Sequence, residues 1–259
     1  MSRLFGTDGI RGVANKPPMD SETALNLGRA LAYVIRKQKG VRHRIIIGKD
    51  TRISGYMLET ALESGISSMG VDTLMIGPLP TPGVAYLTKS MRANAGIMIS
   101  ASHNSFEDNG IKIFGPDGFK LSDAAEDEIE ELMQPGKLDS LRAKPELVGK
   151  AYRMEDARGR YVVYLKSCLS NPSVFEGLKV VMDTANGAAY KIAPLVFEEL
   201  GADITVIANS PDGKNINENC GSLHPEKMCS LVKENKAFCG VAYDGDADRL
   251  IISLSLIHI

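Results

Sequence analysis

The sequence has little of several features that mark special classes of protein. It contains four cysteines in 259 residues, all in the second half, and no two have the CxxC spacing of a zinc or redox site. No run of about eighteen apolar residues occurs, and the opening MSRLFGTDGIRG lacks the apolar segment of a secretory signal. We therefore expect reduced thiols, no membrane span and a cytoplasmic protein.

Charge of one sign is also lacking. The net charge is −2 and there is no long run of Lys or Arg, so nothing indicates binding to nucleic acid or a membrane surface. Hydrophobic residues make up 44% and charged residues 24%, as in soluble globular proteins. A small molecule is therefore the expected partner, and the length fits one or two domains.

Strands and helices alternate along the first half of the chain. An apolar strand from Arg44 is followed by a helix over Tyr56–Met69, with apolar residues at three- and four-residue steps, and then by the strand VDTLMIG. This βαβ order predicts a parallel sheet with packed helices. A short helix to Ser90, the strands AGIMIS and IKIF and an acidic helix over Asp123–Met133 complete the unit.

The same order returns in the second half. A helix over Arg158–Leu169 precedes the strand LKVVMD, the turn TANGA, a helix to Leu200 and the strand DITVI. We interpret the fold class as α/β, with mixed, largely parallel sheets and packed helices in two related domains, the second incomplete. The domains are expected at 1–137 and 156–253, with residues 138–155 as a polar linker. The alternative is that any two βαβ units look alike.

A polar loop follows the strand AGIMIS. The segment GIMISASHNSFEDNGIKIF places Ser102, His103 and Lys112 where a parallel sheet ends, the position at which α/β folds bind ligands. A serine held there can present its hydroxyl to a phosphoryl group, and the other two side chains can move protons. The alternative is an ordinary polar loop.

A second polar loop follows the strand CGVAY. Asp244, Asp246 and Asp248 alternate with small residues and precede Arg249, so three carboxylates can converge on one hard cation, for which Mg²⁺ is the natural choice. An EF-hand is excluded because its sixth and twelfth positions would hold Arg249 and Ser255 instead of Gly and Glu. A phosphatase with an aspartyl nucleophile and a solvated acidic turn remain as alternatives.

Two of these strings resemble known signatures. SASHN with NGIK is similar to the phosphoserine loop of the α-D-phosphohexomutase superfamily, and DGDADR is similar to its metal loop. LFGTDGIRGVAN and GKDTRISG resemble the bacterial phosphoglucosamine mutases within it. One departure is Ser105, where the family commonly has proline; without the fixed φ of proline the loop is expected to be less restricted.

The resemblance implies roles for individual residues. Ser102 would carry the phosphate as donor and acceptor, and would bind Mg²⁺ together with Asp244, Asp246 and Asp248. Lys112 would be a general acid/base, and His103 would contact the phosphoryl group or share in proton transfer. Arg11 and Arg249 would stabilise the negative charge of the phosphoryl group with their guanidinium groups.

The implied activity is an isomerase reaction on a sugar phosphate. A bacterial, cytoplasmic enzyme would interconvert glucosamine 6-phosphate and glucosamine 1-phosphate through a bisphosphate, in the amino-sugar metabolism that supplies cell-wall precursors. The alternatives are a phosphomannomutase or phosphoglucomutase of the same superfamily, or a non-catalytic metal-binding fragment.

The superfamily has four domains, and strings resembling the sugar-binding and phosphate-binding loops of the last two do not occur here. We therefore expect an amino-terminal fragment with phosphohexomutase domains 1 and 2. Residues 254–259, LSLIHI, are expected to be a non-native tail, because a transposon end used in sequencing libraries encodes this hexapeptide. The alternative is a native continuation of a β-strand.

Overall fold

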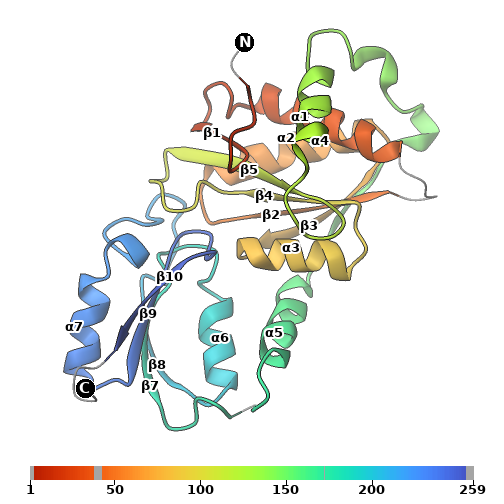
Figure 1. Ribbon diagram of the computed structural model, residues 1–259. Coiled ribbons are helices and arrows are strands. Elements are labelled where there is room, and N and C mark those ends of the chain that lie inside the picture. Colours follow the sequence, from red (N-terminus) through yellow and green to blue (C-terminus); the bar gives the residue numbers. More distant parts are fainter. Residues whose placement is uncertain (1–2, 38–42, 172, 255–259) are drawn as a thin grey trace.

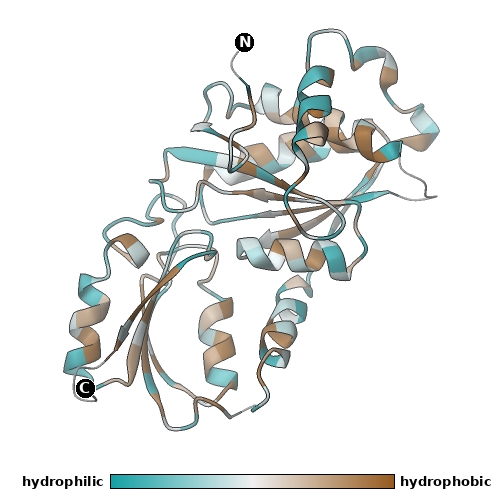
Figure 2. Ribbon diagram, in the orientation of Figure 1, coloured by the Kyte–Doolittle hydropathy of each residue, from teal (hydrophilic) through white to brown (hydrophobic). Residues whose placement is uncertain are grey.

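The chain forms two β-sheets, each with helices packed on it, in a computed structural model that describes residues 3–37, 43–171 and 173–254 (Figure 1). We call each sheet with its helices a domain. Apolar residues are concentrated on the strands and on the helix faces turned toward them, as Figure 2 shows. Within the described ranges no helix is long and apolar enough to cross a bilayer.

The first sheet has six strands in the order β1-β5-β4-β2-β3-β6. Its centre is parallel, with β2 paired to β3 and β4, and β3 paired to β6. β5 runs antiparallel to both β4 and β1. The strands are β1 (Ile10–Val13), β2 (Arg44–Lys49), β3 (Asp72–Pro78), β4 (Ala95–Ile99), β5 (Asp108–Phe114) and β6 (Ala151–Arg153).

Three helices pack around the larger apolar core on one face of this sheet, namely α1 (Ser21–Arg36), α2 (Ser54–Ser68) and α4 (Asp123–Leu132) (Figure 1). α1 begins where the Asp20 side chain accepts from the Thr23 N–H at 2.8 Å, a standard N-cap. α1 and α2 approach closely at Gly65, where an added Cβ would lie 2.2 Å from the Leu25 carbonyl oxygen. α3 (Thr81–Ser90) covers the other face.

The second sheet has four strands in the order β10-β9-β7-β8. β9 (Cys239–Tyr243), β7 (Lys179–Asp183) and β8 (Asp203–Ile207) are parallel, while β10 (Leu250–Leu254) is antiparallel to β9. Two helices lie on opposite faces, α6 (Ile192–Glu199) and α7 (Glu226–Glu234) (Figure 1).

One apolar cluster joins the domains. α5 (Ala157–Ser167) carries Tyr161 and Val162 between Val84 of α3 and Ile192 of α6. This packing brings the carboxyl ends of β4 and β9 into the same region, and that is where the polar loops lie.

The expected mixed, largely parallel sheets with packed helices are confirmed, with helix ends within a few residues of those predicted. Residues 138–155 contain more structure than a bare linker, because their apolar contacts and β6 attach them to the first domain. They include the 3₁₀ turns η1 (Asp139–Leu141) and η2 (Pro145–Leu147), and a third, η3 (Gly221–Leu223), lies in the second domain.

Two further expectations concern the cysteines and the tail. All four cysteines are free thiols, as expected. Of the tail expected at 254–259, Leu254 continues β10 opposite Cys239, and 255–259 lie outside the described residues.

Candidate active site

The serine loop after β4 meets the aspartate loop after β9. Ser102 is completely buried, and its hydroxyl donates to Asp244 Oδ2 at 2.7 Å although the two residues are 142 positions apart. Ser102 Oγ also accepts a hydrogen bond from Arg249 Nη2 at 2.5 Å. The structure therefore brings together the hydroxyl and the acidic cluster that the sequence places after separate strands.

The close approach of the two loops depends on a glycine. A Cβ on Gly245 would lie 2.5 Å from the Ser102 carbonyl oxygen and 2.8 Å from Asn217 Nδ2. Both are nearer than real Cβ atoms come, so a side chain here would push the serine loop away from Asp244. The close packing of the two loops thus explains why the residue between Asp244 and Asp246 is glycine.

The three aspartates converge as a cation site requires. Asp244, Asp246 and Asp248 each offer a carboxylate oxygen, and these oxygens all lie within 4.8 Å of one another. Asp246 Oδ1 is buried and has no hydrogen-bond partner among the described residues. A buried carboxylate oxygen without a donor is costly, and a hard cation would satisfy it, so the donor set fits a divalent metal.

The remaining carboxylate oxygens of Asp244 and Asp246 accept hydrogen bonds from protein donors. Asp246 Oδ2 accepts from Thr81 Oγ1 at 2.7 Å and from Lys112 Nζ at 2.8 Å, and Lys112 also reaches Asp248 Oδ2 at 3.2 Å. Asp244 is completely buried, and its Oδ1 accepts from the Arg249 N–H at 3.2 Å. Both oxygens of Asp244 therefore accept hydrogen bonds from the protein.

Burial and neighbouring charges separate the pKa values of these groups. Burial, and then repulsion from Asp246 and Asp248, raises the pKa of Asp244 to about 6. Burial also opposes ionisation of Asp246, but the charge and hydrogen bond of Lys112 outweigh it and lower the pKa of Asp246. Burial opposes the charge of Lys112, but the carboxylates of Asp246 and Asp248 outweigh it and raise the pKa of Lys112. The Lys112 side chain is therefore an ammonium.

His103 is neutral at neutral pH. Burial and the positive charges of Arg249 and Arg11 lower its pKa. Arg249 Nη2 donates to His103 Nδ1 at 2.6 Å, which leaves the ring proton on Nε2. The ring also lies beside the Ser102 hydroxyl, with Nδ1 3.5 Å from Ser102 Oγ.

Arg11 lies at the edge of this group of residues. It is on β1 opposite Gly110, and its guanidinium is 3.6 Å from Asp8 Oδ2. A cavity of about 190 Å³ opens between this part of the chain and the site, lined by Thr7, Asp8, Gly9, Thr81, Lys112 and Asp248 among others. All the predicted site residues are thus in one region, with Arg11 at its margin.

Three residues at the site were not predicted as site residues. Arg52, Thr81 and Asn217 bond to the serine or aspartate loop from elsewhere in the chain. Arg52 belongs to the string GKDTRISG, which was used to identify the family, but the sequence assigned no role to this residue. Neither Thr81 nor Asn217 belongs to a pattern that predicts its contacts, since both act across distances of more than a hundred positions.

Comparison with known proteins gives matches over both domains. The family described as phosphoglucomutase/phosphomannomutase, alpha/beta/alpha domain I, matches residues 2–139, and domain II matches residues 159–255. Phosphoglucosamine mutases of Geobacter sp. (strain M21) and Pelobacter propionicus are 62% and 58% identical over 251 and 252 residues. These alignments cover 97% of this chain but 55% and 56% of the relatives, so the chain spans about half their length.

Solved structures give the same fold. A phosphoglucomutase/phosphomannomutase family protein from Burkholderia thailandensis matches with a TM-score of 0.82 and 26% identity, covering 97% of this chain and 54% of that one. A structure described as a putative phosphomannomutase from Thermus thermophilus matches with a TM-score of 0.80 and 24% identity, covering 96% and 56%.

Proposed function

Because the chain belongs to the phosphoglucomutase/phosphomannomutase family, we propose that it supplies the phosphoserine and metal loops of a phosphoglucosamine mutase. The reaction would interconvert glucosamine 6-phosphate and glucosamine 1-phosphate in the cytoplasm. The observation that carries the proposal is the bond of 2.7 Å between Ser102 Oγ and Asp244 Oδ2, which joins the two loops. Relatives of this name at about 60% identity favour the amino sugar over other hexoses.

Ser102 would act as the carrier of the phosphoryl group. In the first step a sugar hydroxyl attacks the phosphorus of phosphorylated Ser102, the bond from phosphorus to Oγ breaks, and a sugar bisphosphate forms. After the bisphosphate reorients, Ser102 Oγ attacks its other phosphoryl group and the isomeric monophosphate leaves. Phosphoryl transfer of this kind requires positioning and charge compensation above all.

The charged residues around Ser102 suit these steps. Arg249 already donates to Ser102 Oγ and can turn its remaining N–H groups to phosphoryl oxygens. Lys112, an ammonium, can supply a proton to the oxygen that leaves, which is Ser102 Oγ in the first step and the sugar oxygen in the second. His103 Nδ1 can accept the proton of the attacking hydroxyl when Arg249 Nη2 turns from it to the phosphoryl group. Arg11, at the margin of the site, would add positive charge on the side of the cavity.

The metal is proposed to be Mg²⁺. Asp244, Asp246, Asp248 and the phosphorylated side chain of Ser102 would hold it, and Asp246 Oδ1 is the buried oxygen with no other donor among the described residues. A bound divalent cation would neutralise negative charge on the phosphoryl group during transfer. Carboxylate and phosphate oxygens are the ligands that Mg²⁺ prefers.

The full-length gene product tests the proposal. Its rate should be measured with glucosamine 6-phosphate, glucose 6-phosphate and mannose 6-phosphate, each with sugar bisphosphate as activator and Mg²⁺. We expect the highest kcat/KM with the amino sugar. A higher kcat/KM with mannose or glucose phosphate would assign the protein to another branch of the family, and turnover without phosphate on Ser102 would overturn the mechanism.

The 259-residue chain by itself should also be tested. Incubation with ³²P-labelled glucose 1,6-bisphosphate and Mg²⁺, followed by peptide mapping, shows whether Ser102 accepts phosphate without the remaining part of the relatives' length. Labelling of Ser102 without mutase turnover would fit a chain that holds the loops but not the whole substrate site.

A further inference from the structure

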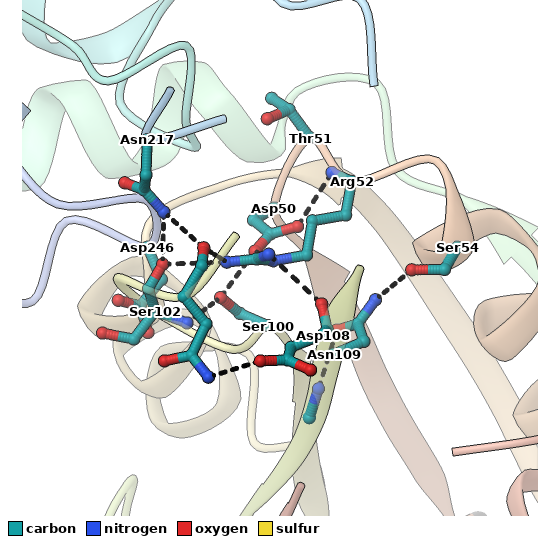
Figure 3. A network of polar contacts seen from close by, with 12 residues as sticks. Asp50, Thr51, Arg52, Ser54, Ser100, Ser102, Asp108, Asn109, Asn217 and Asp246 are labelled. Carbon is teal, nitrogen blue, oxygen red and sulfur yellow. Dashed lines mark hydrogen bonds and ion pairs between the residues drawn. The ribbon is translucent and has the colours of Figure 1, made fainter. Parts of the chain in front are cut away.

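We infer that Arg52 and Asn217 are positioning residues that clamp the serine loop from the two domains and set the position of the Ser102 hydroxyl. The inference rests on the proposed function, because it assigns a purpose to the placement of that hydroxyl. Figure 3 shows both side chains directed at the backbone of the loop. Neither side chain needs to contact the substrate for this role.

Arg52 is bonded through its whole guanidinium. The residue is completely buried, and its Nε donates to Asp50 Oδ2 at 2.8 Å. The four remaining N–H groups point at the serine loop, where the acceptors are the carbonyl oxygens of Ser102 (3.0 Å), Asn104 (2.9 Å), Asp108 (3.2 Å) and Ser105. Five donors with five acceptors make Arg52 a template for the backbone of the loop.

Asn217 holds two of the same carbonyl groups from the second domain. Its Nδ2 donates to the oxygens of Ser102 and Asn104, both at 2.9 Å (Figure 3). Its own backbone is fixed, because its N–H donates to the Ala185 carbonyl at 2.9 Å in the turn after β7. Each of the two carbonyls therefore accepts one bond from each domain.

The backbone at Ser102 needs such support. Its φ is 53°, in the left-handed region that a residue with a side chain rarely adopts. The Ser102 N–H donates to Ser100 Oγ at 2.9 Å, and that hydroxyl donates to Asp50 Oδ2 at 2.6 Å. Asp50 also holds Arg52, so both the N–H and the carbonyl of Ser102 are fixed by one buried pair.

The clamp also sets the distance between the nucleophile and the acids. Ser102 belongs to the first domain and Asp244 to the second, so their separation depends on how the loops dock. Asn217 donates to the serine loop while its own backbone is anchored beside β7. It therefore fixes the position of Ser102 Oγ relative to Asp244. A misplacement of about 1 Å can cost a hundredfold in rate, so this registration matters to transfer.

Asn217→Asp in the full-length protein tests the clamp. The substitution keeps the shape but places a carboxylate oxygen against two carbonyl oxygens, which repels them. Asn219→Ala is the matched control, since Asn219 lies in the same loop with a φ of 50° and its side chain is exposed. Asn217→Ala accompanies them, because it shares with the control the cost of alanine at positive φ.

Two readouts separate positioning from general destabilisation. The first is the single-turnover rate constant for ³²P transfer from glucose 1,6-bisphosphate to Ser102, which does not depend on the fraction of active protein. We expect it to fall about 10- to 100-fold in Asn217→Asp, with KM changed less than about threefold, and to stay near wild type in Asn219→Ala. The second is hydrogen exchange of the peptide spanning residues 100–108, expected to rise in Asn217→Asp alone.

Arg52→Lys gives an independent arm. Lysine keeps the positive charge beside Asp50 but cannot bond four carbonyls at once, so we expect the same fall in the rate constant. If this buried substitution prevents folding, the Asn217 variants still decide the matter.

The outcomes are distinct. A rate constant in Asn217→Asp within twofold of the control overturns the clamp, whatever the exchange data show. Absence of any label on wild-type Ser102 overturns the proposed function instead. In that case the hydrogen exchange of residues 100–108 decides on the clamp, and an unchanged exchange in Asn217→Asp overturns it as well.

Discussion

Thr81 holds Asp246 by two hydrogen bonds. Its hydroxyl donates to Asp246 Oδ2 at 2.7 Å, and its backbone N–H donates to the Asp246 carbonyl oxygen at 2.9 Å. With Oδ2 occupied in this way, Oδ1 is the oxygen left for a cation. A residue of the first domain thus orients the carboxylate that we propose as a metal ligand of the second.

Thr81→Val should weaken Mg²⁺ binding. The substitution keeps the shape of the side chain and the backbone bond but removes the hydroxyl donor to Asp246, and loss of such an outer partner costs about 10- to 100-fold in metal affinity. Isothermal titration measures the dissociation constant directly. Thr60→Val is the control, because Thr60 is an exposed residue of α2; equal affinities of the two variants would contradict the assigned role of Thr81.

Metal affinity should depend on pH through Asp244. Its raised pKa of about 6 means that protons compete with the cation below that pH. Since a raised pKa favours the protonated carboxyl, affinity is lost as pH falls through 6 and is full above 7. From pH 7 to pH 5 the apparent dissociation constant should rise about tenfold.

The control for this pH dependence is Asp244→Asn. It removes the titrating group, so binding should be weak but should vary much less between pH 5 and pH 7. A wild-type dissociation constant that does not change over this interval would show that Asp244 does not ligate the metal.

Ser102→Ala should reduce mutase turnover to background. The substitution removes the oxygen that we propose as the carrier of the phosphoryl group, and effects of losing a nucleophile reach about 10⁶-fold in kcat in other enzymes. Ser105→Ala is the matched control in the same loop, and it should retain activity. Mutase assays of both variants make the comparison, and turnover by Ser102→Ala would exclude the phosphoserine mechanism.

The sequence predicted the strands and loops that follow simple patterns. The βαβ units showed clear apolar periods, and the rule that ligands bind at the carboxyl ends of parallel strands located both polar loops. α1 was not predicted, although Asp20 and the apolar steps of Leu27, Leu31 and Ile35 indicate it. β1 and β10 are edge strands that exist through pairing with β5 and β9, which no local pattern shows.

The parts of the site that were missed depend on long-range contacts. Asn217 acts on the serine loop from 115 positions away, and Thr81 acts on Asp246 from 165 positions away. Their residue types are common in turns and helix starts, so only the folded arrangement gives them a role. Lys112 was predicted, but its ion pairs with Asp246 and Asp248 required the docking of two domains.

Gly65→Ala should destabilise the first domain. The added Cβ would lie 2.2 Å from the Leu25 carbonyl oxygen of α1, a backbone atom that cannot rotate away, so the two helices must separate. Overpacking of this kind costs about 1–3 kcal/mol. Gly159→Ala is the matched control, since Gly159 is an exposed position of α5 where the Cβ would meet nothing within 4 Å. Its better helix propensity should raise the unfolding free energy by about 0.5 kcal/mol. Urea unfolding of both variants should therefore shift in opposite directions, and equal midpoints would show that close packing of α1 on α2 does not limit stability.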